Sequence, residues 1–194
     1  MSSREKILAA VKINQPALQQ LPALEELKAI QYENDFAQFK TVLTTIGGTL
    51  VEIDNTNEIT EYVKNNFTNH QNYVTSLPEL SEIKMLDEHL DPHFLENIEV
   101  AIVNAVFGVA ENGSVWLTDV EMKIRALPFI CQHLAVVLHK KNMVSNMHQA
   151  YALIGENDYD FGVFIAGPSK TADIEQSLVL GAHGPKTMTV FIMN

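Results

Sequence analysis

The hydrophobic positions of this chain follow two spacings, one typical of amphipathic helices and one typical of buried strands. Between residues 35 and 46 apolar side chains recur at helical intervals, and the glycines at 47–48 end the predicted helix. The segments 57–67 and 146–155 predict two more helices. The intervening apolar runs are continuous, which indicates strands that are covered on both faces.

Six such runs predict strands, of which the third is the longest and the last closes the sheet. They are 49–53, 72–76, 99–110, 133–140, 161–167 and 187–193. Strands rich in Val, Ile and Ala that alternate with helices are typical of a parallel sheet between two outer layers. We therefore expect an α/β fold, a three-layer sandwich with a largely parallel central sheet, plus a β-hairpin that turns at Asn112-Gly113.

The first 33 residues form a separate arm in this interpretation. Ile7, Leu8 and Val11 make the apolar stripe of a short helix, and an irregular or partly helical stretch follows it. The predicted organisation is a helical arm over residues 1–33 and a single domain over residues 34–194.

No stretch approaches the roughly 20 apolar residues of a membrane span. Lys12 interrupts the N-terminal apolar segment too early for a signal peptide, so we expect a cytoplasmic protein.

Charge and cysteine content exclude several functions. Against 24 acidic residues the chain has 13 basic ones, for a net charge of −11, which disfavours nucleic acid and anionic membranes as partners. Cys131 is the single cysteine. The chain alone therefore has neither an internal disulfide nor the ligands of an iron–sulfur cluster, and we expect no cofactor bound by it.

Glu111 is the first candidate for chemistry, since a hairpin tip on a rigid sheet can present one carboxylate to a pocket. The alternative is that Asn112-Gly113 is simply a turn. The loop that begins at Gly167 is the second candidate. Ser169 and Thr171 there could begin a short helix with Asp173 in its first turn, or its amides could bind an anion with Lys170 as counter-charge.

Two further candidates complete the set. His183 lies between Gly181 and Gly184, where it is either a turn histidine or the partner of Asp173 if the two loops meet. Arg125 could clamp a carboxylate, or form an ion pair with Asp119 or Glu121.

The segment 87–93 contains His and Asp, but Asp91-Pro92 resembles a helix start, so we predict no metal site. Cys131 is expected to be a packed, small hydrophobic residue.

The motifs GPSKTAD at 167–173 and GAHGP at 181–185, with Glu111, Gly113 and Arg125, resemble the lactate-utilisation C family, or LUD domain, and the resemblance covers most of the chain from Phe36 onward. It implies a NagB/ribose-5-phosphate isomerase/CoA-transferase-like fold. It also implies a role in oxidising L-lactate to pyruvate alongside two iron–sulfur partner proteins. Glu111-Asn112-Gly113 is similar to the Glu-Asn-Gly element of class I CoA-transferases, whose glutamate attacks an acyl-CoA.

Three functional hypotheses follow. The chain is an accessory component of lactate utilisation that binds a small carboxylate, a free-standing acyl-transfer enzyme of the CoA-transferase type that uses Glu111, or a ligand-binding module without chemistry. The candidate catalytic residues are Glu111, His183 and Asp173. The predicted ligand-binding residues are Gly108, Asn112, Gly113, Ser114, Arg125, Gly167, Ser169, Lys170, Thr171, Gly181 and Gly184.

Overall fold

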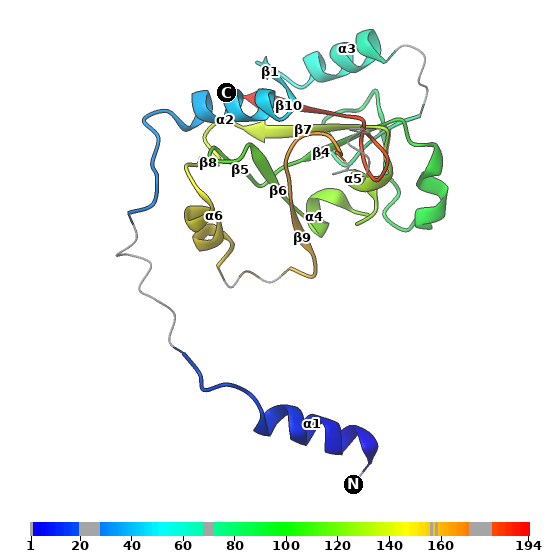
Figure 1. Ribbon diagram of the computed structural model, residues 1–194. Coiled ribbons are helices and arrows are strands. Elements are labelled where there is room, and N and C mark those ends of the chain that lie inside the picture. Colours follow the sequence, from blue (N-terminus) through cyan, green and yellow to red (C-terminus); the bar gives the residue numbers. More distant parts are fainter. Residues whose placement is uncertain (1, 20–27, 68–71, 156, 158, 171–179) are drawn as a thin grey trace.

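A computed structural model describes residues 2–19, 28–67, 72–155, 157, 159–170 and 180–194, and a six-stranded sheet forms its centre (Figure 1). The strands lie in the order β1 (Thr49–Ile53), β10 (Thr187–Met193), β7 (His133–His139), β4 (Val100–Asn104), β2 (Tyr73–Thr75) and β3 (Lys84–Met85). Every neighbouring pair is parallel. The predicted α/β class with a largely parallel central sheet is confirmed.

A second, smaller sheet supplies the predicted hairpin. Its strands lie in the order β8 (Met143–Val144), β5 (Phe107–Val109), β6 (Ser114–Thr118) and β9 (Gly162–Ile165). β5 and β6 are antiparallel neighbours joined through residues 110–113, and β9 pairs antiparallel with β6. Because β5 follows β4 almost directly, the chain passes from the central sheet into the smaller one within two residues.

The two faces of the central sheet have different covers. Helix α3 (Asn57–Asn66) packs its buried Ile59 and Val63 on one face. The other face is covered by α2 (Asp35–Thr45), the smaller sheet and the short helices η2 (Pro92–Asn97), α4 (Asp119–Met122) and α5 (Leu127–Ile130). In Figure 1, α3 and the smaller sheet lie on opposite sides of the parallel strands.

Two helices lie outside these layers. Helix α6 (Met147–Ile154) packs on the outer face of the smaller sheet through Ala150 and Ile154. Helix α1 (Ser3–Ile13) has a capping box formed by Ser2 and Glu5 and buries none of its residues. No helix in the described part of the chain is long and apolar enough to cross a membrane.

Three strand predictions need correction. The run 99–110 is two strands, β4 and β5, because the Ala105 N–H donates to Val137 in the central sheet while the Val106 N–H donates to Trp116 in the smaller one. Both halves are buried, so hydrophobicity does not reveal the break.

The run 161–167 is β9 of the smaller sheet, half-buried rather than in the core. The last strand, β10, lies between β1 and β7 and so does not close the sheet.

Candidate functional site

Glu111 lies at the exposed hairpin tip, where its carboxylate binds the start of α6. Its Oε2 accepts a hydrogen bond from the Met147 backbone N–H at 2.9 Å, and its own N–H donates to the Ser145 carbonyl. The first amides of a helix have no partner within the helix and form its positive end. Glu111 therefore has a structural task, and its role as a nucleophile stays a prediction.

The other hairpin residues serve the turn and the core. Asn112 Oδ1 accepts hydrogen bonds from the backbone N–H and the hydroxyl of Ser114, at 3.0 and 2.7 Å. Of the two turn residues, Asn112 and Gly113, only Gly113 has a positive φ, at 68°. A Cβ there would lie 2.9 Å from the Leu43 nitrogen, and a Cβ at Gly108 would lie 2.8 Å from Leu138 Cδ2. These glycines allow close packing of the backbone.

The loops around Gly167 and His183 meet, which was the condition for a contact between Asp173 and His183. The Ser169 N–H donates to the Pro185 carbonyl at 2.9 Å, and the Gly181 N–H donates to the Ser169 carbonyl at 3.1 Å. A Cβ on Gly184 would lie 3.0 Å from Ser169 Cβ. His183 itself is exposed.

Thr171 and Asp173 lie outside the described residues, as does the short helix predicted after Ser169. The proposed contact between Asp173 and His183 therefore stays a prediction.

Both loops lie at the amino edge of the central sheet. A Cβ on Gly167 would come 3.1 Å from the Ile46 carbonyl, and one on Gly47 would come 3.7 Å from Lys170 Nζ, directly before β1. The Lys186 N–H donates to the Gln132 carbonyl, directly before β7. We call residues 167–170 and 180–185 the amino-edge loops.

Arg125 does not join the amino-edge loops. It forms ion pairs with Asp119 at 3.7 Å and Asp160 at 3.6 Å, and it lies over the Phe161 ring with its guanidinium carbon 5.6 Å from the ring centroid. The register of β6 with β9 places these groups at the end opposite the hairpin tip. The alternative interpretation of Arg125, an ion pair with Asp119, is confirmed.

A polar cavity that the sequence analysis missed opens at the carboxyl edge of the central sheet. We call this cavity, of about 350 Å³, the carboxyl-edge pocket. It is lined by Thr56, Ser76, Leu77, Pro78, Glu79, Asn104, Val120, Glu121, Lys123, Val137, His139 and Met193. Thr56, Ser76 and Asn104 follow or end β1, β2 and β4, and His139 and Met193 end β7 and β10.

The topology of the sheet explains why a cavity forms there. After β2 the chain continues to β3 on one side, whereas after β4 it continues to β7 on the other side. Connections that leave two neighbouring strands in opposite directions leave a crevice outside their carboxyl ends, and this is where open α/β sheets commonly bind ligands. Ser76 and Asn104 border that crevice, next to His139.

Lys123 adds a cation on a strained backbone. Its φ of 62° and ψ of −49° are accompanied by a hydrogen bond from the Ile124 N–H to the Met122 carbonyl at 2.7 Å, which closes a γ-turn around Lys123. It is the one non-glycine residue with positive φ within the described part of the chain. Such turns are rare and costly for a residue with a Cβ, and they occur preferentially at functional sites.

Glu121 stabilises α4, the short helix that ends just before Lys123. Its Oε2 accepts hydrogen bonds from the backbone N–H of Thr118 at 3.0 Å and from the Thr118 hydroxyl at 2.5 Å, which completes a capping box at the start of α4. The carboxylate of Glu121 is thus already hydrogen-bonded to Thr118. Lys123, whose side chain is exposed, supplies a positive charge to the lining of the pocket.

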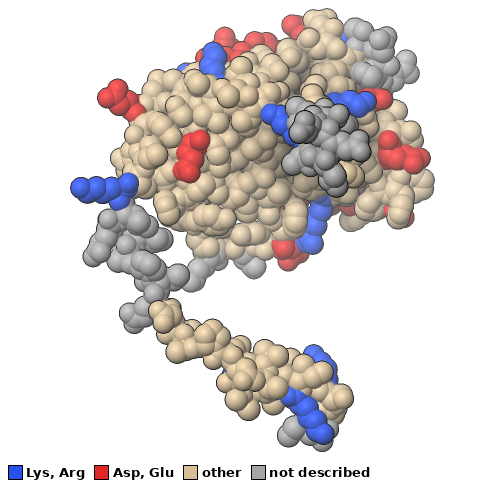
Figure 2. Space-filling view, viewed as in Figure 1, with Lys and Arg blue, Asp and Glu red and all other residues tan. Residues whose placement is uncertain are grey.

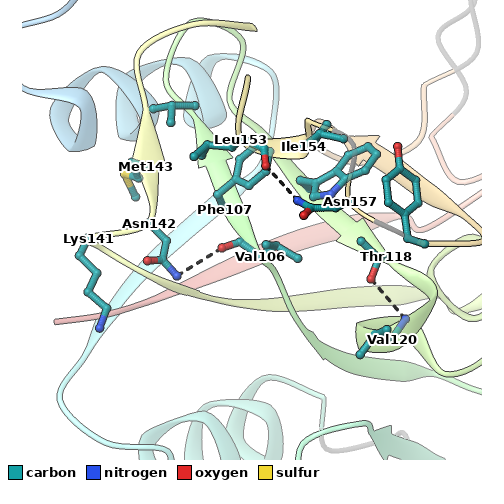
Figure 3. Close-up of a pocket in the computed structure, with 13 residues that line it drawn as sticks. Val106, Phe107, Thr118, Val120, Lys141, Asn142, Met143, Leu153, Ile154 and Asn157 are labelled. Carbon is teal, nitrogen blue, oxygen red and sulfur yellow. Dashed lines mark hydrogen bonds between the residues drawn. The ribbon is translucent and has the colours of Figure 1, made fainter. Parts of the chain in front are cut away.

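A second, apolar cavity of about 560 Å³ lies on the outer face of the smaller sheet, beside α6 (Figure 3). We call it the apolar groove. It is lined by Val106, Phe107, Trp116, Thr118, Val120, Lys141, Asn142, Met143, Val144, Leu153, Ile154, Asn157 and Tyr159. Val120 lines both cavities, so the groove and the carboxyl-edge pocket are neighbours.

Cys131 is buried in the main core, and this burial raises the pKa of its thiol to about 12, as expected of a packed hydrophobic residue.

Among the described residues there is no group of three or more His, Cys, Asp or Glu side chains that could hold a metal ion. Asp91 caps η2 by accepting the His93 N–H, which confirms the predicted helix start.

The fold is an α/β domain with a crevice at the carboxyl ends of its parallel strands, and comparison with known proteins places it in a family. Residues 88–193 match the model of the LUD domain, so the chain belongs to the LUD domain family. A protein from Deinococcus radiodurans of the family called DUF162 has a similar fold, with a TM-score of 0.63 at 14% identity over 82% of this chain and 96% of that one.

Curated relatives have the name lactate utilization protein C. The relative from Bacillus pumilus is 36% identical over 102 residues, which cover 46% of this chain and 42% of that protein. The relative from Shouchella clausii is 33% identical over 111 residues, which cover 53% of this chain and 48% of that protein. The chain thus spans about half the length of the curated relatives it matches.

The missed pocket residues have a recognisable signal. Asn104 and His139 are the last residues of buried strands, and polar residues at that position gather at one edge of a parallel sheet. Asn104 escaped notice because the predicted strand 99–110 continued through it.

Proposed function

We propose that this chain takes part in lactate utilisation and binds a small 2-hydroxy or 2-oxo carboxylate in the carboxyl-edge pocket. The observation that carries the proposal is the polar crevice at the strand ends, with Lys123 as its cation. The names of the relatives support a role in lactate utilisation, and the pocket is where we expect its metabolite to bind.

The residue types of the pocket suit such a ligand. A lysine ammonium binds a carboxylate as a point charge. The Asn104 amide donates and accepts hydrogen bonds, and so does a neutral His139 ring, which matches a hydroxyl or keto oxygen beside the carboxylate. His139 pairs with Met193 in the sheet, and Asn104 pairs with Val137. Asn104 and His139 are therefore held on adjacent strands, with His139 two positions beyond the partner of Asn104 and roughly 8 Å from it.

The amino-edge loops and the hairpin tip at residues 110–113 are the alternative location. Glu111 binds the Met147 amide, and Gly113 and Gly167 lie against α2 and its end. These contacts explain the glycines without a ligand, which favours the carboxyl edge as the binding site. Catalysis by Glu111, Asp173 and His183 remains a hypothesis for this second location.

Titration calorimetry with L-lactate, pyruvate and acetate tests the proposal. We expect the first two to bind and acetate, which lacks the 2-oxygen, to bind more weakly. Lys123→Met should weaken binding about 10-fold to 100-fold, the usual effect of losing one charge-assisted hydrogen bond. Lys141→Met removes an equal charge from the apolar groove and is the matched control. Equal affinities for Lys123→Met and the unmodified chain would refute the assignment.

We also propose that iron–sulfur proteins of lactate oxidation are the partners of this chain, since one cysteine cannot supply a cluster. Gentle anaerobic purification from native cells grown on L-lactate tests this. Co-elution of brown proteins in stoichiometric amount supports the partnership, and a colourless chain that elutes alone contradicts it.

A further inference from the structure

Helix α1 has an apolar stripe that is exposed along its length. Ile7, Leu8 and Val11 are 63, 55 and 55% exposed. The helix nevertheless has caps at both ends, since Ser2 and Glu5 form a capping box and the Asn14 side chain donates to the Ala10 carbonyl at 2.8 Å. Eleven residues are too few for a stable isolated helix in water, so a helix this well specified points to a surface that it binds.

The apolar groove is an unfilled surface of matching character. Val106, Val120 and Leu153, at its rim, remain 39, 65 and 53% exposed. Figure 3 shows the ring of Phe107 and the side chains of Leu153 and Ile154 around the hollow. An apolar, concave surface beside a helix is the usual seat of an amphipathic helix, which inserts side chains at i, i+3 and i+4. Leu8, Val11 and the neighbouring Ile7 have this spacing.

The opposite charges of α1 and the rest of the chain also favour docking of this helix on the domain. Residues 1–14 have three of the 13 basic residues and one of the 24 acidic ones, so the remaining chain has ten basic and 23 acidic residues. Figure 2 shows Lys and Arg side chains on the exposed helix and Asp and Glu side chains scattered over the domain. A basic helix is attracted to an acidic domain.

The attachment of the arm favours the groove of the same chain. Residues 30–32 are fixed at the start of α6, because the Ile30 carbonyl accepts from the Asn146 side chain at 2.7 Å and the Tyr32 N–H donates to the Ser145 hydroxyl at 3.4 Å. Leu153 and Ile154 of the groove lie at the other end of this eight-residue helix, about 12 Å away. Residues 14–29, sixteen in all, can span up to about 53 Å.

We propose that α1 docks its Ile7, Leu8 and Val11 face into the apolar groove of its own chain. In this structure α1 is not docked. In the docked form the helix covers Val120, a residue that lines both the groove and the carboxyl-edge pocket. A tether that reaches the site gives the helix an effective concentration of about millimolar, so the same chain outcompetes a second copy at ordinary concentrations.

Energy transfer within the full-length chain tests the docking. Trp116 is the sole tryptophan and lines the groove, so it serves as donor. Ser3→Cys places an acceptor dye on α1, while the buried Cys131 thiol, with its pKa raised to about 12, resists labelling at neutral pH. The unsubstituted chain treated with the dye measures any background.

We expect strong transfer that does not change with protein concentration. Val11→Glu should lower the ratio of docked to undocked chains about tenfold or more, since it brings a charge into an apolar contact. Ala9→Glu, on the opposite face of α1, adds the same charge and should leave transfer unchanged. In the groove, Leu153→Glu should act like Val11→Glu, and Ala152→Glu, exposed on α6 outside the groove, is its control.

Two results would overturn the proposal. Weak transfer that Val11→Glu leaves unchanged would show that α1 does not dock. Transfer that rises with protein concentration would assign the helix to the groove of a second copy. Circular dichroism of each variant checks that the fold is intact, which we expect because Val11 and Leu153 are both more than half exposed.

Discussion

The two edges of the central sheet differ in how their residues are used. At the amino edge, glycine-rich loops pack against the end of α2 and against each other, and a Cβ at Gly167 or Gly184 would come within about 3 Å of a neighbouring atom. At the carboxyl edge, polar side chains such as Asn104 and His139 border an open cavity. A motif that looks like a ligand loop in a sequence can therefore be a packing device, whereas a binding site can arise from single polar residues at strand ends.

The largest expected effect tests the packing role of the glycine at the hairpin tip, which lies against α2. Gly113→Ala should lower the free energy of unfolding by about 3–4 kcal/mol, because alanine is strained at positive φ and its Cβ would meet the Leu43 backbone. Gly155→Ala is the control, since Gly155 also has positive φ but its nearest contact would be an ordinary 3.5 Å. We expect that variant to lose only about 1–2 kcal/mol.

Urea titration measures both variants. Equal losses for the two would mean that Gly113 does not pack closely on α2, and would return the hairpin tip to consideration as an open, ligand-binding loop.

The next effect tests the strained cation at the carboxyl edge. Lys123→Gly should raise the free energy of unfolding by about 1 kcal/mol, since glycine adopts the γ-turn without strain. Lys123→Met keeps the strain and should leave stability nearly unchanged. Both variants should lose carboxylate affinity. If Lys123→Gly is destabilising, or if it binds pyruvate as the unmodified chain does, the strain is unrelated to binding.

A smaller effect is expected at Glu111. Glu111→Ala removes the acceptor for the Met147 amide and should cost about 1 kcal/mol, whereas Glu111→Gln keeps an acceptor oxygen and should cost roughly half as much. Thermal unfolding separates the two. Loss of growth on L-lactate in Glu111→Gln cells, with the melting temperature preserved, would instead support the nucleophile hypothesis.

The smallest effect concerns the thiol next to α5. The buried Cys131 should react with iodoacetamide at pH 8 only after unfolding in urea, because its raised pKa keeps the thiol protonated and the core shields it. Mass spectrometry measures the extent of alkylation. Rapid reaction of the folded chain would show that this part of the amino edge is open to solvent.

Hydrophobic pattern predicted much of the fold and less of the site, for a physical reason. The strand at 49–53 and the helix that ends before Gly47 were predicted because propensity and periodicity act locally. The break after Asn104 was not, because a strand that changes sheets stays buried throughout. The carboxyl-edge pocket depends on strand order, which brings Ser76 and His139 together from distant parts of the chain.

Crystallisation of the chain with pyruvate would locate the ligand. We expect density in the carboxyl-edge pocket, with the pyruvate carboxylate in contact with Lys123 and its keto oxygen facing Asn104 or His139. Density beside His183 in the amino-edge loops, or beside Glu111 at the hairpin tip, would contradict this assignment and show that the glycine-rich motifs form the binding site.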